Sequence, residues 1–163
     1  MKLLDVRFNL PIPLGKIEGK DWVFIDDWSA SILVDGLWEN FYFLKGAITD
    51  LGSVPTKLQG IVNNGSSGLF ALIFFLFHDN CYVTKQRNRR WSDELLRAGL
   101  ADDACKVMDS WDSSLVYYSL RISSDAKKSW NEPCVSADKF QHITMSPKPI
   151  YKLESQLHRL RDY

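Results

Sequence analysis

Hydrophobic residues alternate with polar ones in short runs over the first 45 residues of the chain. Residues 22–25, 31–34 and 38–44 are rich in aromatic and β-branched types, which favour strands. Asp35 and Gly36 lie between two of these runs and are typical of a short hairpin turn, because glycine readily adopts positive φ. The pattern predicts N-terminal antiparallel β-hairpins.

Beyond residue 65 the spacing of apolar positions changes to three and four, which predicts helices. Ser66 or Ser67 is expected to cap a helix that runs through His78 to Tyr82. Ser92 is expected to cap a short second helix that ends at Gly99. A third helix from about residue 102 carries one apolar stripe, which we expect to face the core. The stripe consists of Val107, Met108, Trp111, Leu115, Tyr118 and Ile122. The sequence thus predicts an α+β fold with a packed cluster of three helices.

The pattern weakens near the C-terminus, where Pro147 and Pro149 precede a last amphipathic segment. Its apolar positions are Ile150, Leu153, Leu157 and Leu160. We expect residues 1–134 to form a single α+β domain and residues 135–163 to form a C-terminal arm with a short helix. Such an arm is expected to pack mainly against another chain.

Composition narrows the classes of function. Twenty basic residues balance 20 acidic ones, so nucleic-acid binding is not expected. The longest apolar run, residues 69–77, is far shorter than the roughly 20 residues of a membrane-spanning helix, and no transmembrane segment is expected. The three cysteines form neither a disulfide framework nor a zinc-binding pair. The first residues lack the features of a secretory signal, so we expect synthesis in the cytoplasm.

The segment FLFHDNCY carries the candidate chemistry. His78 and Tyr82 are one helical turn apart on the same face, and Asp93 on the next helix is placed to return towards His78. His78 is then a candidate base that activates water, with Asp93 orienting one ring nitrogen. Asp79 is a candidate cation ligand together with Asp50. Calcium is the cation considered, because it takes oxygen ligands and the loop at residues 46–55 offers backbone carbonyls.

Each of these residues also has a structural interpretation. His78 is equally explained as a satisfied histidine at a helix end, and Asp50 as a cap of its own turn. Asp93 is also explained as a residue that stabilises the N-terminus of its helix, and Arg90 with Asp93 as a structural ion pair. Nothing marks the Cys81 thiol as activated. Ser53 with His78 and an aspartate would form a nucleophilic triad, but the Gly-x-Ser-x-Gly elbow is missing.

The string His78-Asp79-Asn80-Cys81-Tyr82 resembles the active-site helix of secreted phospholipases of the A2 class. Residues 93–96, DELL, are similar to the partner helix of the prokaryotic and fungal members. The resemblance implies that His78 is the general base, that Asp79 binds calcium and that Asp93 orients His78. The glycine-rich calcium loop of that family, with its cysteines, has no match in this sequence.

A broader resemblance covers about half of the chain. Its elements are Gly46-x-x-Thr49-Asp50-Leu51-x-Ser53-Val54-Pro55, His78-Asp79-x-x-Tyr82, Arg90-x-x-Asp93 and Leu120-Arg121. In this order they resemble a family of small phage and prophage proteins without an assigned function. We therefore expect a virion structural protein, made in the host cytoplasm, in a tail, connector or baseplate. It would bind other phage structural proteins through the C-terminal arm. A His-Asp hydrolytic site is expected either within that role or as the alternative function, a phospholipase A2-like or cell-wall-directed hydrolase.

Overall fold

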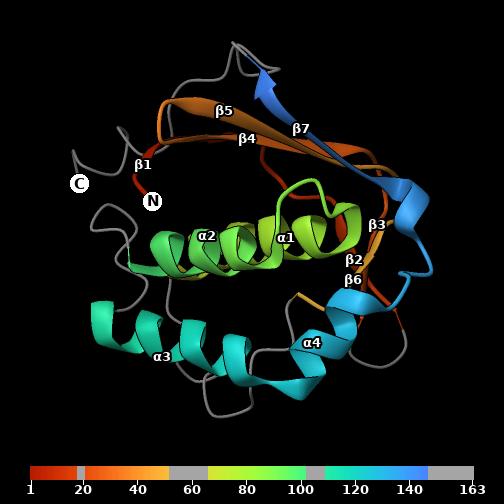
Figure 1. Cartoon of the computed structure of the whole chain (residues 1–163). Helices are drawn as coiled ribbons and strands as arrows, with labels where there is room; N and C mark the ends of the chain where they lie inside the picture. The colour runs from red at the N-terminus through yellow and green to blue at the C-terminus, as the bar shows by residue number, and fades with distance from the viewer. Residues whose placement is uncertain (18–20, 52–65, 102–108, 147–163) are drawn as a thin grey trace.

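The computed structural model describes residues 1–17, 21–51, 66–101 and 109–146 (Figure 1). A four-stranded antiparallel sheet has the strand order β1-β4-β5-β7, and a smaller antiparallel sheet has the order β2-β3-β6. The strands are β1 (Leu3–Phe8), β2 (Leu14–Lys16), β3 (Trp22–Phe24), β4 (Trp28–Val34), β5 (Leu37–Phe43), β6 (Ile48–Thr49) and β7 (Phe140–Ser146). The helices are α1 (Ser66–Thr84), α2 (Arg89–Ala101), α3 (Ser110–Ile122) and α4 (Ser124–Asn131), and a 3-10 turn, η1 (Ala137–Lys139), precedes β7.

The predicted hairpin turn is confirmed between β4 and β5. Asp35 and Gly36 both have positive φ, 49° and 84°, and Val34 pairs with Leu37 on the two sides of the turn. Two consecutive residues with positive φ match the right-handed twist of the flanking strands. The position of this turn was therefore predicted correctly from the sequence.

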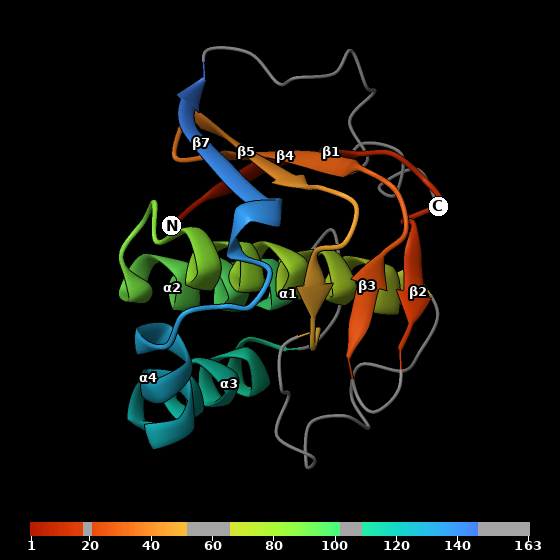
Figure 2. The same ribbon diagram turned by 90° about the vertical axis from the view of Figure 1, so that its right-hand side faces the viewer.

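The elements stack in three layers. One face of the four-stranded sheet lies on α1 and α2, and α3 and α4 lie beyond these helices (Figures 1 and 2). The α+β prediction is confirmed, but the described residues contain four helices instead of the predicted three. The extra helix begins directly after α3, because the Ser123 hydroxyl accepts a hydrogen bond from the Ala126 amide and caps a new helix.

The core lies between the sheet and α1. On β4 every second residue faces it, namely Trp28, Ala30, Ile32 and Val34. Phe41 on β5 stacks on Phe77 of α1 with ring centroids 4.4 Å apart. Helix α1 is buried on nearly all sides because it lies between the sheet and the other helices. In the described parts of the chain no helix has both the length and the apolar character needed to span a bilayer.

Helix α2 differs from its prediction at both ends. It begins at Arg89, and the Asn88 side chain, not Ser92, accepts a hydrogen bond from the Trp91 amide in the first turn. It continues through Gly99 to Ala101. A Cβ atom at Gly99 would lie 2.2 Å from the Phe74 ring. Gly99 thus permits close packing of α2 on α1 and does not end the helix.

The expected orientation of α3 is wrong. Four residues of the predicted core stripe are exposed: Trp111 by 71%, Leu115 by 43%, Tyr118 by 62% and Ile122 by 84%. We call these four residues the α3 stripe. The buried residues of α3 are instead Ser113 and Val116. The other two residues of the predicted stripe, at positions 107 and 108, lie outside the described residues.

Part of the predicted C-terminal arm belongs to the sheet. Residues 140–146 form β7, which pairs with β5 and places His142 opposite Phe41. The expectation that this segment packs against another chain is therefore wrong for β7. Pairing with β7 covers the edge that β5 would otherwise expose, and an open edge invites aggregation. The predicted terminal helix falls within residues 147–163, outside the described residues.

Candidate functional site: a buried cluster around Asp93

Two side chains of α1 meet one side chain of α2 inside the helical layer. His78 and Tyr82 are one turn apart, and their rings lie with centroids 4.2 Å apart. The His78 Nε2 atom is 3.0 Å from Asp93 Oδ1. The Tyr82 hydroxyl donates a hydrogen bond of 2.7 Å to the same oxygen. The predicted contact between His78 and Asp93 is confirmed, and Tyr82 joins it. Their catalytic roles stay predictions.

Two arginines complete the surroundings of Asp93. Arg121 of α3 donates to Asp93 Oδ2 over 3.1 Å, and Arg89 Nε lies 3.8 Å from the same oxygen. Arg89 also donates to the Tyr82 hydroxyl over 3.2 Å and to the backbone carbonyl of Leu120. The fully buried Asp93 carboxylate thus joins α1, α2 and α3. We call His78, Tyr82, Arg89, Asp93 and Arg121 the Asp93 cluster.

The surroundings of Asp93 favour its charged form. Burial raises the pKa of this carboxyl. Hydrogen bonds from His78, Tyr82 and Arg121 and the charge of His78 lower the pKa by more than burial raises it, so that the net pKa lies below its ordinary value. Burial raises the pKa of the Tyr82 hydroxyl, and the neighbouring Asp93 carboxylate adds to that rise. Tyr82 therefore stays protonated and remains a hydrogen-bond donor to Asp93.

One candidate cation ligand, Asp79, lies at the edge of the cluster, with Oδ1 4.0 Å from His78 Nδ1. Asp79 accepts a hydrogen bond from the Thr49 hydroxyl, which itself accepts one of 3.0 Å from the Leu51 amide. Asp50 is exposed. Within the described ranges no three His, Cys, Asp or Glu side chains converge as they would around a metal ion. Part of the loop expected to supply carbonyl ligands, residues 52–55, lies outside those ranges, so a calcium-binding role stays a prediction.

The structure separates the alternatives for several residues. His78 does not lie at a helix end, because α1 continues to Thr84. Arg90 pairs with Glu94 over 3.0 Å, and the ion pairs of Asp93 are formed with Arg89 and Arg121. Ser53 lies outside the described residues.

A second buried polar cluster was not predicted from the sequence. His142 of β7 places Nε2 2.9 Å from Glu39 Oε2, and Arg87 donates from Nε to Glu39 Oε1 over 3.2 Å. Both Glu39 and His142 are buried. This cluster ties β7 and the α1–α2 connection to β5. The sequence feature that could have indicated this cluster is Glu39, a glutamate within the strand pattern of residues 38–44.

Cys81 lies beside this second cluster, with Sγ 4.0 Å from His142 Nδ1. The arrangement of the thiol, the imidazole and the Glu39 carboxylate resembles that of a thiol nucleophile, its general base and the carboxylate that orients the base. Cys81 is, however, fully buried, and burial raises the pKa of its thiol. A buried, protonated thiol is unreactive, so this group has a packing role.

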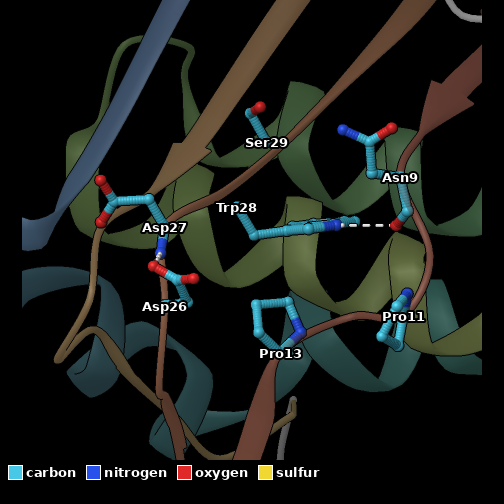
Figure 3. Close-up of a pocket in the computed structure, with 7 residues that line it drawn as sticks. All are labelled: Asn9, Pro11, Pro13, Asp26, Asp27, Trp28 and Ser29. Carbon is cyan, nitrogen blue, oxygen red and sulfur yellow. Dashed lines mark hydrogen bonds between the residues drawn. The ribbon is translucent and has the colours of Figure 1, made fainter.

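Two open recesses are lined by residues of neither cluster. One, of about 280 Å³, is lined by Trp28 and its neighbours near the junction of the two sheets (Figure 3). The Trp28 ring crosses it and donates to the Asn9 carbonyl over 2.9 Å (Figure 3). The other, of about 260 Å³, lies between α2 and α3. His78 and Asp93 line neither recess, and His78 is only 5% exposed. Among the described residues the Asp93 cluster therefore has the burial of a structural site.

The cluster makes a direct prediction for stability. Asp93→Asn removes a buried charge that arginines of two helices contact, and breaking a buried ion pair costs about 3–5 kcal/mol. We expect the free energy of unfolding at neutral pH to fall by about that amount, measured by urea denaturation. Glu94→Gln is the matched control, because the exposed Arg90–Glu94 pair contributes about 0–1 kcal/mol. Equal losses in the two variants would contradict the assignment.

Comparison of the wild type with Asp93→Asn at different pH values gives a second test. In the unfolded chain the pKa of Asp93 returns to about 3.9, whereas in the folded chain it is lower. The ionised carboxylate therefore stabilises the fold fully above about pH 4, and this contribution is lost as pH falls through the folded pKa. The stability difference between wild type and Asp93→Asn should shrink in this acid range. A difference that does not change with pH would show that Asp93 is not held ionised by the fold.

No protein-family model, curated protein or solved structure matches this chain. The contacts of the described residues, together with the sequence motifs, therefore carry its functional interpretation.

Proposed function

We propose that this chain is a non-enzymatic structural component of a phage particle, in the tail, connector or baseplate, and that the α3 stripe is its assembly surface. The observation that carries the proposal is the exposure of two large aromatic and two aliphatic side chains along one helix face. Clustered aromatic residues on a surface are typical of protein–protein contacts. The motifs of residues 46–55, 78–82 and 90–93 support the phage context through their resemblance to small phage and prophage proteins.

The Asp93 cluster supports the same proposal in a second way. All charged and polar groups around Asp93 are used in contacts that join helices, and the carboxylate is fully buried. A general base needs access to water and substrate, whereas His78 is only 5% exposed. The cluster instead holds α3 in the orientation that exposes its stripe.

A second candidate function is ester hydrolysis, and one observation favours it. Asp93 holds Nε2 of His78, and the other ring nitrogen, Nδ1, lies 4.0 Å from Asp79 Oδ1 at the edge of the cluster. A base oriented in this way beside a carboxylate that could hold calcium is what the phospholipase resemblance implies. In this interpretation His78 activates water and Asp79 holds the cation.

The assembly role predicts which variants fail to enter particles. The wild-type chain should be found in purified particles of the phage that encodes it, and Leu115→Glu should lower its copy number at least about tenfold, because a charge would be buried in the contact. The measurement is quantitative mass spectrometry of the particles. Val135→Glu is the control, since Val135 is 97% exposed and lies outside α3. Absence of the wild-type chain from the particles would refute the proposal.

The two candidate functions differ in a simple assay. Wild type and Asp79→Asn are compared on a lipid ester and on cell-wall material, each with and without calcium. The non-enzymatic role predicts background rates for both proteins in every condition. Calcium-dependent hydrolysis that Asp79→Asn removes, with the variant still folded, would establish the hydrolase in its place.

A further inference from the structure

We propose that the α3 stripe pairs with the α3 stripe of a second copy of this chain, antiparallel, around a two-fold axis that passes between Leu115 and Tyr118. This inference rests on the proposed function, because it names the first partner of the same assembly surface. The second copy would cover the largest group of apolar side chains that α3 exposes.

The spacing of the stripe residues is the same when it is followed in either direction along the helix. Its positions, 111, 115, 118 and 122, are separated by four, three and four residues. Reversing the helix gives the same series, so antiparallel pairing places Trp111 beside Ile122 of the second copy and Leu115 beside Tyr118 of the second copy. A two-fold interface requires this self-complementarity, since the same patch must serve both copies. Each aromatic ring then lies beside an aliphatic side chain.

Small polar residues flank the stripe on both sides. Ser114 and Ser119 lie on opposite edges of the exposed face and are equally distant in sequence from the proposed axis. Short side chains at these positions allow two helices to approach closely. The interface then has an apolar centre and a polar rim, as protein–protein interfaces commonly have.

The charges at the two ends of α3 favour the antiparallel direction. Asp109 caps the helix and Asp112 lies in its first turn. Arg121 lies in its last turn, where its partly exposed side chain also contacts Asp93. On α4 the exposed Lys127 and Lys128 outnumber Asp125, although Lys128 lies 3.6 Å from Glu132. Antiparallel pairing places the acidic end of each helix beside the basic end of the other. It also places the helix dipoles in opposite directions, which is the favourable arrangement. Parallel pairing would bring like ends together.

The size of the surface predicts a weak dimer. A stable dimer uses roughly 20–30 residues on each partner, whereas the α3 stripe consists of four side chains on one 13-residue helix. The dimer should therefore form in a concentration-dependent way with the isolated protein. Further contacts in a particle would strengthen it through effective concentration.

The test measures both association and direction with the full chain. Analytical ultracentrifugation over a wide range of concentrations should show a monomer–dimer equilibrium. Leu115→Glu should raise the dissociation constant at least about tenfold, and Val135→Glu should leave it unchanged. Circular dichroism verifies that both variants keep their helices.

Direction is tested by disulfide formation in a background that carries Cys105→Ser and Cys134→Ser. One protein then carries Trp111→Cys and the other carries Ile122→Cys. Oxidation of their mixture should yield a cross-linked dimer of the two proteins, and neither protein alone should cross-link efficiently. Cross-linking of the Trp111→Cys protein with itself, or a monomer at every concentration, would overturn the inference.

The outcomes also separate this inference from the proposed function. If the isolated chain is always monomeric but Leu115→Glu still prevents entry into particles, the proposed dimer is wrong, whereas the α3 stripe remains the assembly surface. If the dimer forms as described but Leu115→Glu enters particles normally, the assembly role of the α3 stripe is wrong and the dimer stands.

Discussion

The buried negative charge of Asp93 is the constraint on which the helical half of this protein depends. A carboxylate with no exposed surface is tolerated only when cations and hydrogen-bond donors surround it. Here α1 supplies a tyrosine hydroxyl and an imidazole, and α3 supplies a guanidinium. Satisfying one carboxylate thus fixes the positions of three helices relative to one another. The Glu39–His142 cluster has a corresponding role at the sheet, where it holds β7 and the α1–α2 connection on β5.

The orientation of α3 follows from this constraint more than from its apolar pattern. Arg121 must point towards Asp93, and the carbonyl of Leu120 accepts a hydrogen bond from Arg89. These contacts turn Val116 and Ser113 inward and leave the α3 stripe on the outside. Large apolar side chains that gather on one exposed helix face are typical of contact surfaces, and for this reason we propose that the stripe serves assembly and that a second copy is its partner.

The sequence predicted the features that depend on neighbouring residues. The Asp35-Gly36 turn, the extent of α1 and the meeting of His78 with Asp93 follow from local patterns and a short connection. The stripe of α3 was predicted with the wrong orientation, because periodicity identifies a helix face but not the side it turns to the core. Contacts distant in sequence left no pattern to find. Glu39 and His142 are 103 positions apart, and pairing of β7 with β5 depends on a sheet edge that no local signal marks.

Hydrogen exchange of α3 in the wild type and in Asp93→Asn tests this account most directly. Local opening exposes amides in cooperative units, and their exchange reports the stability of each unit. If Asp93 holds α3 in place, amides of residues 110–122 should lose protection in Asp93→Asn much more than those of β4 and β5. Equal protection of α3 in the two proteins would show that the apolar contacts of Val116 and its neighbours suffice to hold the helix, and that the buried carboxylate does not determine which face is exposed.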